Sequence, residues 1–457
     1  MALTEPEPVV FSSSDATGGR KPRHRPAPES AARTHARSLP VVPVRARGMT
    51  IEDATGRRYL DCLSGGGTLA LGHNHPVVLE AIRSVLHSGA CSRTGGSAAA
   101  VRSRFVAELA RLLPPGLDDA ARIRICGPAE GDALAAAVRL VREATGRRTV
   151  AAFTGSREGE TAPDSGEARP DLLPHPSDYR CPFGVGGRRG WELCLRRADH
   201  VLGRTGTEPP AAVLVEPVQG EHGGVVPAPD GWLRGLRTLT SERNIPLIAD
   251  ESQTGVGRTG ALWAVGHSGI APDVMILSGT IGGSLPLAVL AHREELACGR
   301  PGPGPDAHRG NQLAMAAGAA TLSYVAGSGL CERAALLGER MLRRLRELAL
   351  HHPFIGDVRG RGLMLGAELV APVRPPRSDD AVVGRHPRPA VPAADTAVAV
   401  RRACLRRGLI VGIGGRDANV VCLLPPLTIT DEQAESVLDR LSEAVAAVER
   451  AGDRSAV

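Results

Sequence analysis

The sequence predicts an α/β fold with a large domain built on a mostly parallel sheet and a smaller α+β lobe. Between about residues 98 and 328, helical patterns such as 131–147 alternate with short β-branched runs at 211–217 and 245–251. Alternation of helix and buried strand is typical of a parallel sheet with helices on both faces. The chain also has 457 residues, more than a single hydrophobic core usually organises.

Five segments follow one another along the chain. Residues 1–38 are rich in Pro, Ser, Arg and Thr without apolar periodicity, which predicts a flexible N-terminal extension. Residues 39–97 contain a hairpin that turns at 53–56 and an amphipathic helix closed by Gly89, and they form the N-terminal segment of the small lobe. The large domain, the C-terminal small domain and a tail are expected at 98–328, 329–450 and 451–457.

The C-terminal small domain mixes helices and strands. It begins with a long amphipathic helix predicted over 329–350 and ends with a second helix and a short strand at 409–413. A Pro- and Arg-rich stretch at 372–392 lies between them and is predicted to be a loop.

Composition excludes several classes of function. The formal net charge is +6, and a basic cluster at Arg20, Lys21, Arg23 and Arg25 has no aromatic residues beside it, which argues against nucleic-acid binding. No apolar run is long enough to span a membrane. The nine cysteines are scattered without a C-x-x-C pair, so neither a disulfide framework nor a metal site is indicated. We expect a cytoplasmic protein.

Two acidic residues end predicted strands of the large domain. Glu216 follows the run at 211–215 and Asp250 ends the run at 245–250. Ligands of such sheets bind outside the carboxyl ends of the strands, which makes both residues site candidates. The alternative is that they are acids of surface turns.

Long motifs from about residue 40 to residue 450 carry a resemblance to a known family. Together they resemble class III aminotransferases, which use pyridoxal phosphate. YRCPFG and RGNQLAMAAGAATL are similar to segments of the diaminobutyrate–2-oxoglutarate transaminases in that family. The other stretches are DATGRRYLDCLSGGGTLALGHNHP, GPAEGDALAAAVRLVREATGR, VEPVQGEHGGVVPAPDGWL, LIADESQTGVGRTG and LLPPLTIT.

The resemblance implies a fold-type I homodimer whose large domain holds a mostly parallel, seven-stranded sheet, with pyridoxal phosphate at the subunit interface. It implies amino transfer between a diamino acid and 2-oxoglutarate, and a lysine that holds the cofactor as a Schiff base. On the matching motifs, Asp250 would contact the pyridine nitrogen and Gln253 would lie near the phenolic oxygen. Glu216 would pair with an arginine that binds the substrate carboxylate.

The lysine of this pattern is replaced. After APDVMILS the family has the lysine, whereas this chain has Gly279. The only lysine of the chain is Lys21, in the predicted extension, and arginine remains protonated at any useful pH. Glycine supplies neither the amine of a Schiff base nor a group that moves a proton. We therefore do not expect covalent binding of pyridoxal phosphate.

The positions that would hold the cofactor's phosphate differ as well. The family has a small hydroxyl residue and then glycine at a helix N-terminus, but Ala129 and Glu130 stand here, ahead of Gly131. A carboxylate beside a phosphate dianion costs roughly 1 kcal/mol or more. In the family, a threonine of the neighbouring subunit also contacts the phosphate. This chain has Ala307 at that position, followed by His308. These changes argue against non-covalent binding too.

Two more positions depart from the pattern. Where the family has an aromatic residue and a histidine that face the cofactor, this chain has Arg157 and Glu158. The ring that would stack on the cofactor is therefore missing. The arginine that would bind the substrate carboxylate is Cys422, so the family's partner for Glu216 is replaced.

Three hypotheses follow. The residues favour a pseudoenzyme that scaffolds, regulates or pairs with another protein, as a homodimer or with a hetero-partner. The second is an enzyme remodelled for lysine-free chemistry in specialised metabolism on a small amino or oxo acid. Its candidate groups are Glu130, Glu158, Asp250, Cys422 and His308. The third is residual transamination with non-covalently bound pyridoxamine phosphate.

Overall fold

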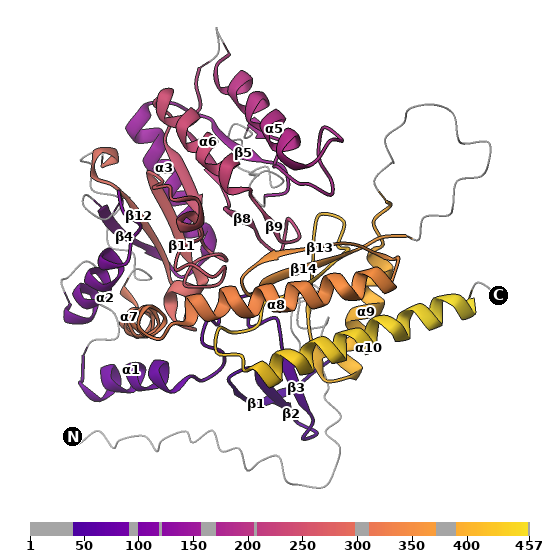
Figure 1. Ribbon diagram of the computed structural model, residues 1–457. Coiled ribbons are helices and arrows are strands. Elements are labelled where there is room, and N and C mark those ends of the chain that lie inside the picture. The colour runs from indigo at the N-terminus through magenta and orange to yellow at the C-terminus, as the bar shows by residue number, and fades with distance from the viewer. Residues whose placement is uncertain are drawn as a thin grey trace, which may run out of the picture.

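The computed structural model describes residues 40–90, 99–117, 121–156, 171–204, 208–297, 310–371 and 390–455 (Figure 1). Several predicted features lie outside these residues: the extension at 1–38 with Lys21, the pair Arg157 and Glu158, the pair Ala307 and His308, and residues 372–389 of the Pro-rich stretch.

A seven-stranded sheet forms the centre of the large domain, in the order β4-β12-β11-β10-β7-β5-β6. Only β12 runs antiparallel to its neighbours, so the prediction of a mostly parallel sheet is confirmed. The strands are β4 (Ala121–Gly127), β5 (Val150–Phe153), β6 (Asp171–Leu173), β7 (Ala212–Val215), β10 (Leu247–Asp250), β11 (Val274–Ser278) and β12 (Ala288–Arg293).

Helices cover both faces of this sheet. Successive side chains of each strand point to opposite faces and pack against the helices there. Ile248 of β10 packs in the cluster that holds the alanine face of α3 (Glu130–Thr145). Its neighbours Leu247 and Ala249 pack in the opposite cluster. That cluster receives α2 (Ala100–Arg111), α5 (Gly187–Leu202), α6 (Asp230–Glu242) and α7 (Gln312–Gly327). Because successive side chains alternate between faces, one apolar run fills two cores.

The N-terminal segment and the C-terminal lobe meet in a small sheet. Strands β1 (Pro43–Arg47), β2 (Thr50–Asp53) and β3 (Arg58–Asp61) form an antiparallel meander, and β15 (Leu409–Ile410) pairs with β3. The predicted hairpin is present, since the Asp53 carboxylate accepts hydrogen bonds from the backbone N–H groups of Thr55 and Arg57 at 2.8 and 3.1 Å. The N-terminal segment is therefore built into the C-terminal lobe.

The rest of the small lobe is a second sheet with three helices. The sheet order is β13-β14-β17-β16. Its strands and helices are β13 (Ile355–Arg361), β14 (Met364–Leu369), β16 (Gly412–Gly414), β17 (Val420–Leu423), α8 (Leu330–His351), α9 (Ala394–Arg406) and α10 (Asp431–Ser455). The helix predicted over 329–350 is α8, and the one closed by Gly89 is α1 (Pro76–His87), with φ +65° at that glycine. The domain boundaries remain a proposal.

No single helix within the described ranges has both the length and the apolarity to cross a membrane. Only α7 and α8 taken together, with a bend of 70° between them, meet that criterion.

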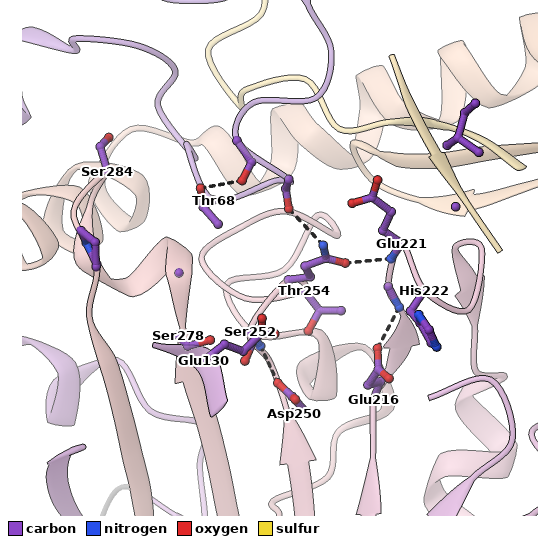
Figure 2. A pocket seen from close by; sticks show the side chains of 18 of the residues that line it. Thr68, Glu130, Glu216, Glu221, His222, Asp250, Ser252, Thr254, Ser278 and Ser284 are labelled. Atoms are coloured by element: carbon purple, nitrogen blue, oxygen red, sulfur yellow. Dashed lines mark hydrogen bonds between the residues drawn. The ribbon is translucent and has the colours of Figure 1, made fainter. Parts of the chain in front are cut away.

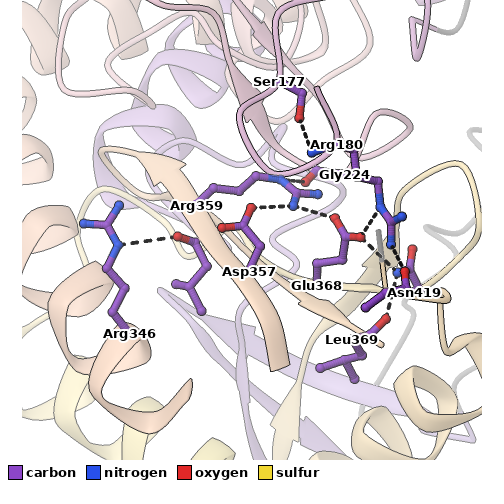
Figure 3. Close-up of polar contacts among 11 residues, drawn as sticks. Ser177, Arg180, Gly224, Arg346, Asp357, Arg359, Glu368, Leu369 and Asn419 are labelled. Carbon is purple, nitrogen blue, oxygen red and sulfur yellow. Dashed lines mark hydrogen bonds and ion pairs between the residues drawn. The ribbon is translucent and has the colours of Figure 1, made fainter. Parts of the chain in front are cut away.

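A buried polar network ties the small lobe to the loop between β8 (Val218–Gln219) and β9 (Val226–Pro227), as Figure 3 shows. The Arg359 guanidinium donates to Glu368 at 2.6 Å and to the backbone oxygen of Gly224 at 3.0 Å. Arg180 donates to the other carboxylate oxygen of Glu368. Because Gly224 closely follows Glu221 and His222, which line the cavity described below, this network fixes part of its rim.

Candidate functional site

A cavity of about 770 Å³ opens where the carboxyl ends of β7, β10 and β11 meet the small lobe (Figure 2). Five of the residues singled out from the sequence line it: Glu130, Glu216, Asp250, Gln253 and Gly279. They come from four separate segments of the chain. Glu216 and Asp250, which were selected because they end predicted strands, therefore line one cavity.

Asp250 and Gln253 are held by backbone groups. Asp250 ends β10 with an exposed fraction of 7%, and its Oδ1 accepts a hydrogen bond from the N–H of Ser252 at 2.9 Å. The Gln253 amide accepts from the N–H of Glu221 at 2.9 Å and donates to the oxygen of Gly66 at 3.0 Å. Gln253 therefore joins the strand end to the loop after β8 and to the N-terminal segment.

Glu216 is oriented by the loop that follows it. Its Oε2 accepts a hydrogen bond from the N–H of Gly220 at 2.8 Å. This hydrogen bond holds the Glu216 carboxylate on the cavity wall.

Gly279 follows β11 in a backbone conformation that favours glycine. Its φ is +59°, in the left-handed region, and a Cβ atom there would lie 2.8 Å from Cγ2 of Thr68. Thr68 comes from the N-terminal segment, where its hydroxyl donates to the Gly65 oxygen at 2.9 Å. None of the described residues is a lysine, because Lys21 precedes them. The space beside Gly279 is thus partly filled by a methyl group.

The N-terminus of α3, which the resemblance implies as the phosphate position, carries two acidic residues. Glu130 and Asp132 lie in its first turn, and Asp132 accepts a hydrogen bond from the N–H of Ala129 at 2.9 Å. A helix N-terminus attracts anions through its free N–H groups and its dipole. Here Asp132 already accepts the N–H of the N-cap residue. Ala129 and Gly131 are not among the described lining residues of the cavity.

Cys422 packs behind the cavity wall but is not among the residues that line the cavity. It is fully buried in β17, and burial raises the pKa of its thiol well above the ordinary value. Its Sγ contacts the Val420 oxygen at 3.7 Å and approaches Gly414 of β16. The structure therefore does not bring the Cys422 thiol together with Asp250 and Glu216 on the cavity wall.

The sequence interpretation missed seven polar residues that line the cavity: Thr68, Glu221, His222, Ser252, Thr254, Ser278 and Ser284. Ser252 and Ser278 stand at the carboxyl ends of neighbouring parallel strands, so the rule that selected Asp250 would have selected them too. Thr68 had no comparable signal, because its approach to Gly279 depends on how the lobes pack.

These observations test the cofactor that the resemblance implies. Asp250 and Gln253 suit a pyridine ring. Gly279 offers no amine, and Glu130 adds a carboxylate to the cavity wall. The described residues therefore do not fit pyridoxal phosphate in its covalent form.

Glu251, next to Asp250, makes stability depend on pH. It is 2% exposed, it accepts a hydrogen bond from the N–H of Val265 at 2.9 Å, and burial raises its pKa to about 7. Between its ordinary value of 4.5 and 7, the folded carboxyl keeps a proton that the unfolded one has released. Its contribution is thus complete below pH 4.5 and is lost as the pH rises through 7.

We expect Glu251→Gln to remove this loss, because glutamine keeps a neutral acceptor. The quantity to follow is the free energy of unfolding of the variant minus that of the parent protein. This difference should grow by on the order of 3 kcal/mol from pH 4.5 to pH 8. Urea denaturation across that range measures the difference. Parallel pH curves for the two proteins would show that Glu251 does not retain its proton.

Comparisons with known proteins agree with the fold. The family model that matches is Aminotransferase class-III, over residues 31–445. The diaminobutyrate–2-oxoglutarate aminotransferase of Rhizobium meliloti (strain 1021) is 44% identical over 444 residues, which are 94% of this chain and 92% of that protein. The enzyme of the same name from Haemophilus influenzae is 37% identical and covers 91% of this chain and 93% of its own.

Solved structures resemble the chain over almost its whole length. A thermostable (S)-enantioselective omega-transaminase from Thermomicrobium roseum has a TM-score of 0.77 at 27% identity, with 93% of this chain and 96% of its own covered. An amine transaminase from an uncultivated Pseudomonas species, in its PLP-bound internal aldimine form, has a TM-score of 0.78 at 27% identity, with 92% and 98% covered. The large and small lobes thus follow the architecture of these transaminases.

Proposed function

Because the chain belongs to the class III aminotransferase family, we propose that it keeps the fold and the ligand cleft but does not transfer amino groups through a lysine Schiff base. It is a pseudoenzyme that acts by binding rather than by turnover. The observation that carries this proposal is Gly279 on the cavity wall of a chain whose only lysine is Lys21.

The changes around Gly279 support the same conclusion. Thr68 stands where a side chain at position 279 would begin, and Glu130 lies at the end of the cavity that would receive a phosphate. Ala307 and Glu158, outside the described residues, are further departures at cofactor positions. Pyridoxal phosphate is the cofactor of the family, but binding to this chain, covalent or not, would meet unfavourable residues at all of these positions.

A coupled assay for glutamate tests the proposal. With pyridoxal phosphate, diaminobutyrate and 2-oxoglutarate, we expect no glutamate above the rate measured without protein. The Rhizobium meliloti relative, at 44% identity, is the positive control under the same conditions. Glutamate formation that depends on this protein would refute the proposal.

A second candidate function is residual transamination between a diamino acid and 2-oxoglutarate. It is favoured by Asp250 and Gln253, which keep the identities and the places that the family pattern gives them. Under this alternative the same assay would yield glutamate when pyridoxamine phosphate replaces pyridoxal phosphate, and Asp250→Asn would abolish it.

The third candidate is an enzyme remodelled for lysine-free chemistry, favoured by the carboxylates of Glu130 and Asp250 in one cavity. Loss of a measured activity in Asp250→Asn or Glu158→Gln, at an unchanged urea midpoint, would support it over the pseudoenzyme.

We also propose a cytoplasmic homodimer as the assembly, with a related subunit as the alternative hetero-partner. Light scattering during size-exclusion chromatography gives the subunit number directly. A mass of one subunit at micromolar concentration would contradict the dimer.

A further inference from the structure

A groove of about 1130 Å³ lies where α1, α2 and α7 meet, and it shares no lining residue with the cavity described above. Figure 1 shows α1 and α2 beside α7, and both helices contact it. Ala316, Ala319 and Ala320 line the groove from one face of α7, at intervals of three and four residues. Because alanine has no side-chain atom beyond Cβ, the space between the helices stays open.

The groove combines apolar and basic side chains. Its half-buried apolar residues include Val77, Leu79 and Val101. It is also lined by three exposed arginines, which are Arg47, Arg83 and Arg104. Glu80 is the only acidic residue among the described residues that line it. The groove therefore suits an occupant that has both apolar and acidic side chains.

One stretch of the chain outside the described residues has this composition. Residues 5–11, with the sequence EPEPVVF, carry two carboxylates, no basic side chain and then three apolar side chains in a row. Phe11 is the only aromatic residue among positions 1–39. Carboxylates pair favourably with arginine, and large apolar side chains gain free energy when they leave water. Residues 5–11 are thus complementary to the groove in charge and in polarity.

The length of the chain allows this stretch to reach the groove. The described structure begins at Pro40, six positions before Ala46, which lines the groove. Residues 12–39 connect Phe11 to Pro40, and a chain of 28 residues spans up to roughly 90 Å. A tether of this kind gives an effective concentration on the order of 1 mM. Docking therefore requires only a modest intrinsic affinity.

A second copy of the protein is the alternative occupant. A two-fold interface brings the same patch of both subunits together. In a dimer centred on this groove, the arginines of one copy would lie near those of the other, and like charges repel each other. The groove therefore suits the acidic stretch better than it suits a copy of itself.

We propose that the groove between α1, α2 and α7 binds residues 5–11 of its own chain. Glu5 and Glu7 pair with the arginines of the groove, and Phe11 fills the space over the alanines of α7. This inference concerns a surface separate from the cavity, so it holds or fails independently of the proposed function.

Photo-crosslinking in the full chain tests the docking. Phe11 is replaced by p-benzoylphenylalanine, and irradiation attaches this side chain to a C–H group beside it. We expect adducts on peptides that contain 76–88, 101–104 or 316–320, in protein that migrates as one chain. Adducts that join two chains would overturn the inference, because the occupant would then belong to a second copy. Adducts only on other peptides, or no adducts, would overturn it as well.

Charge reversal identifies the contacts. Arg83→Glu with Arg104→Glu should lower the adduct yield at least about fivefold, because two attractions become repulsions. Adding Glu5→Arg and Glu7→Arg should restore most of the yield. Raising the salt concentration to about 1 M should lower the yield of the parent protein, since it screens exposed charges.

The matched control for these variants is Arg102→Glu. Arg102 lies on α2 with Arg104 but does not line the groove, so its reversal should change the yield by less than about twofold. A yield that the reversal of Arg83 and Arg104 leaves unchanged, or that the reversal of Glu5 and Glu7 does not restore, would contradict the docking.

Discussion

Replacing Gly279 with alanine is expected to lower the free energy of unfolding by roughly 2 to 5 kcal/mol, and replacing it with lysine by no less. Two costs add. A side chain at φ +59° strains the backbone by roughly 1 to 2 kcal/mol. The contact of 2.8 Å between the new Cβ and Cγ2 of Thr68 overpacks the site by roughly 1 to 3 kcal/mol more.

Matched variants separate the two costs. Gly269 has a similar φ of +63°, and a Cβ atom added there would have no neighbour within 4 Å, so Gly269→Ala should show the backbone cost alone. Thr68→Ser removes the obstructing methyl group and keeps the hydroxyl that donates to Gly65. In the Thr68→Ser background, the cost of Gly279→Ala should fall to that of Gly269→Ala. Equal costs for the two single alanine variants would show that Thr68 does not obstruct position 279.

Arg258→Met is expected to destabilise the protein by on the order of 3 to 5 kcal/mol. Arg258 is 1% exposed and donates to three backbone oxygens, those of Gly67 at 2.9 Å, Leu363 at 3.5 Å and Pro425. These oxygens belong to the N-terminal segment, the turn after β13 and the stretch after β17. Each would lose its buried donor, at about 1 to 3 kcal/mol apiece before relaxation.

The control for Arg258 is an arginine on the surface. The Arg188 side chain is 83% exposed and pairs with Glu192, so Arg188→Met should change stability by less than about 0.5 kcal/mol. Urea denaturation followed by circular dichroism compares both variants with the parent. A loss below about 1 kcal/mol for Arg258→Met would mean that water replaces its donors, and that Arg258 does not hold the lobes together.

The sequence was sufficient for the features that repeat along the chain. Alternation of helix and strand predicted the sheet, and the strand-end rule found Asp250 and Glu216 without knowledge of their surroundings. The motif pattern added Gln253 and Gly279, which line the same cavity. Each of these predictions needed only local pattern or position along a strand.

Features that depend on contacts between distant segments could not be predicted. Thr68 lies beside Gly279 although 211 positions separate them in the chain. Arg258 donates hydrogen bonds to distant segments, such as Gly67, whose positions in the sequence follow no regular spacing. The unpaired hydroxyls of Ser252 and Ser278 appear only when every neighbour is in place. The resemblance implies a substrate-binding position for Cys422, yet its side chain packs against Gly414 of β16 and is not among the residues that line the cavity. In a strand, a shift of one residue reverses the face that a side chain takes.

Borohydride trapping tests the central claim most directly. The protein is incubated with pyridoxal phosphate, reduced and digested, and the peptides are examined by mass spectrometry, with Lys21→Arg as a variant that has no side-chain amine. We expect no modified peptide from the folded domain in either protein, and no visible absorbance that reduction removes. A cofactor adduct at a stoichiometry near one per chain, on any residue of the folded domain, would contradict the account.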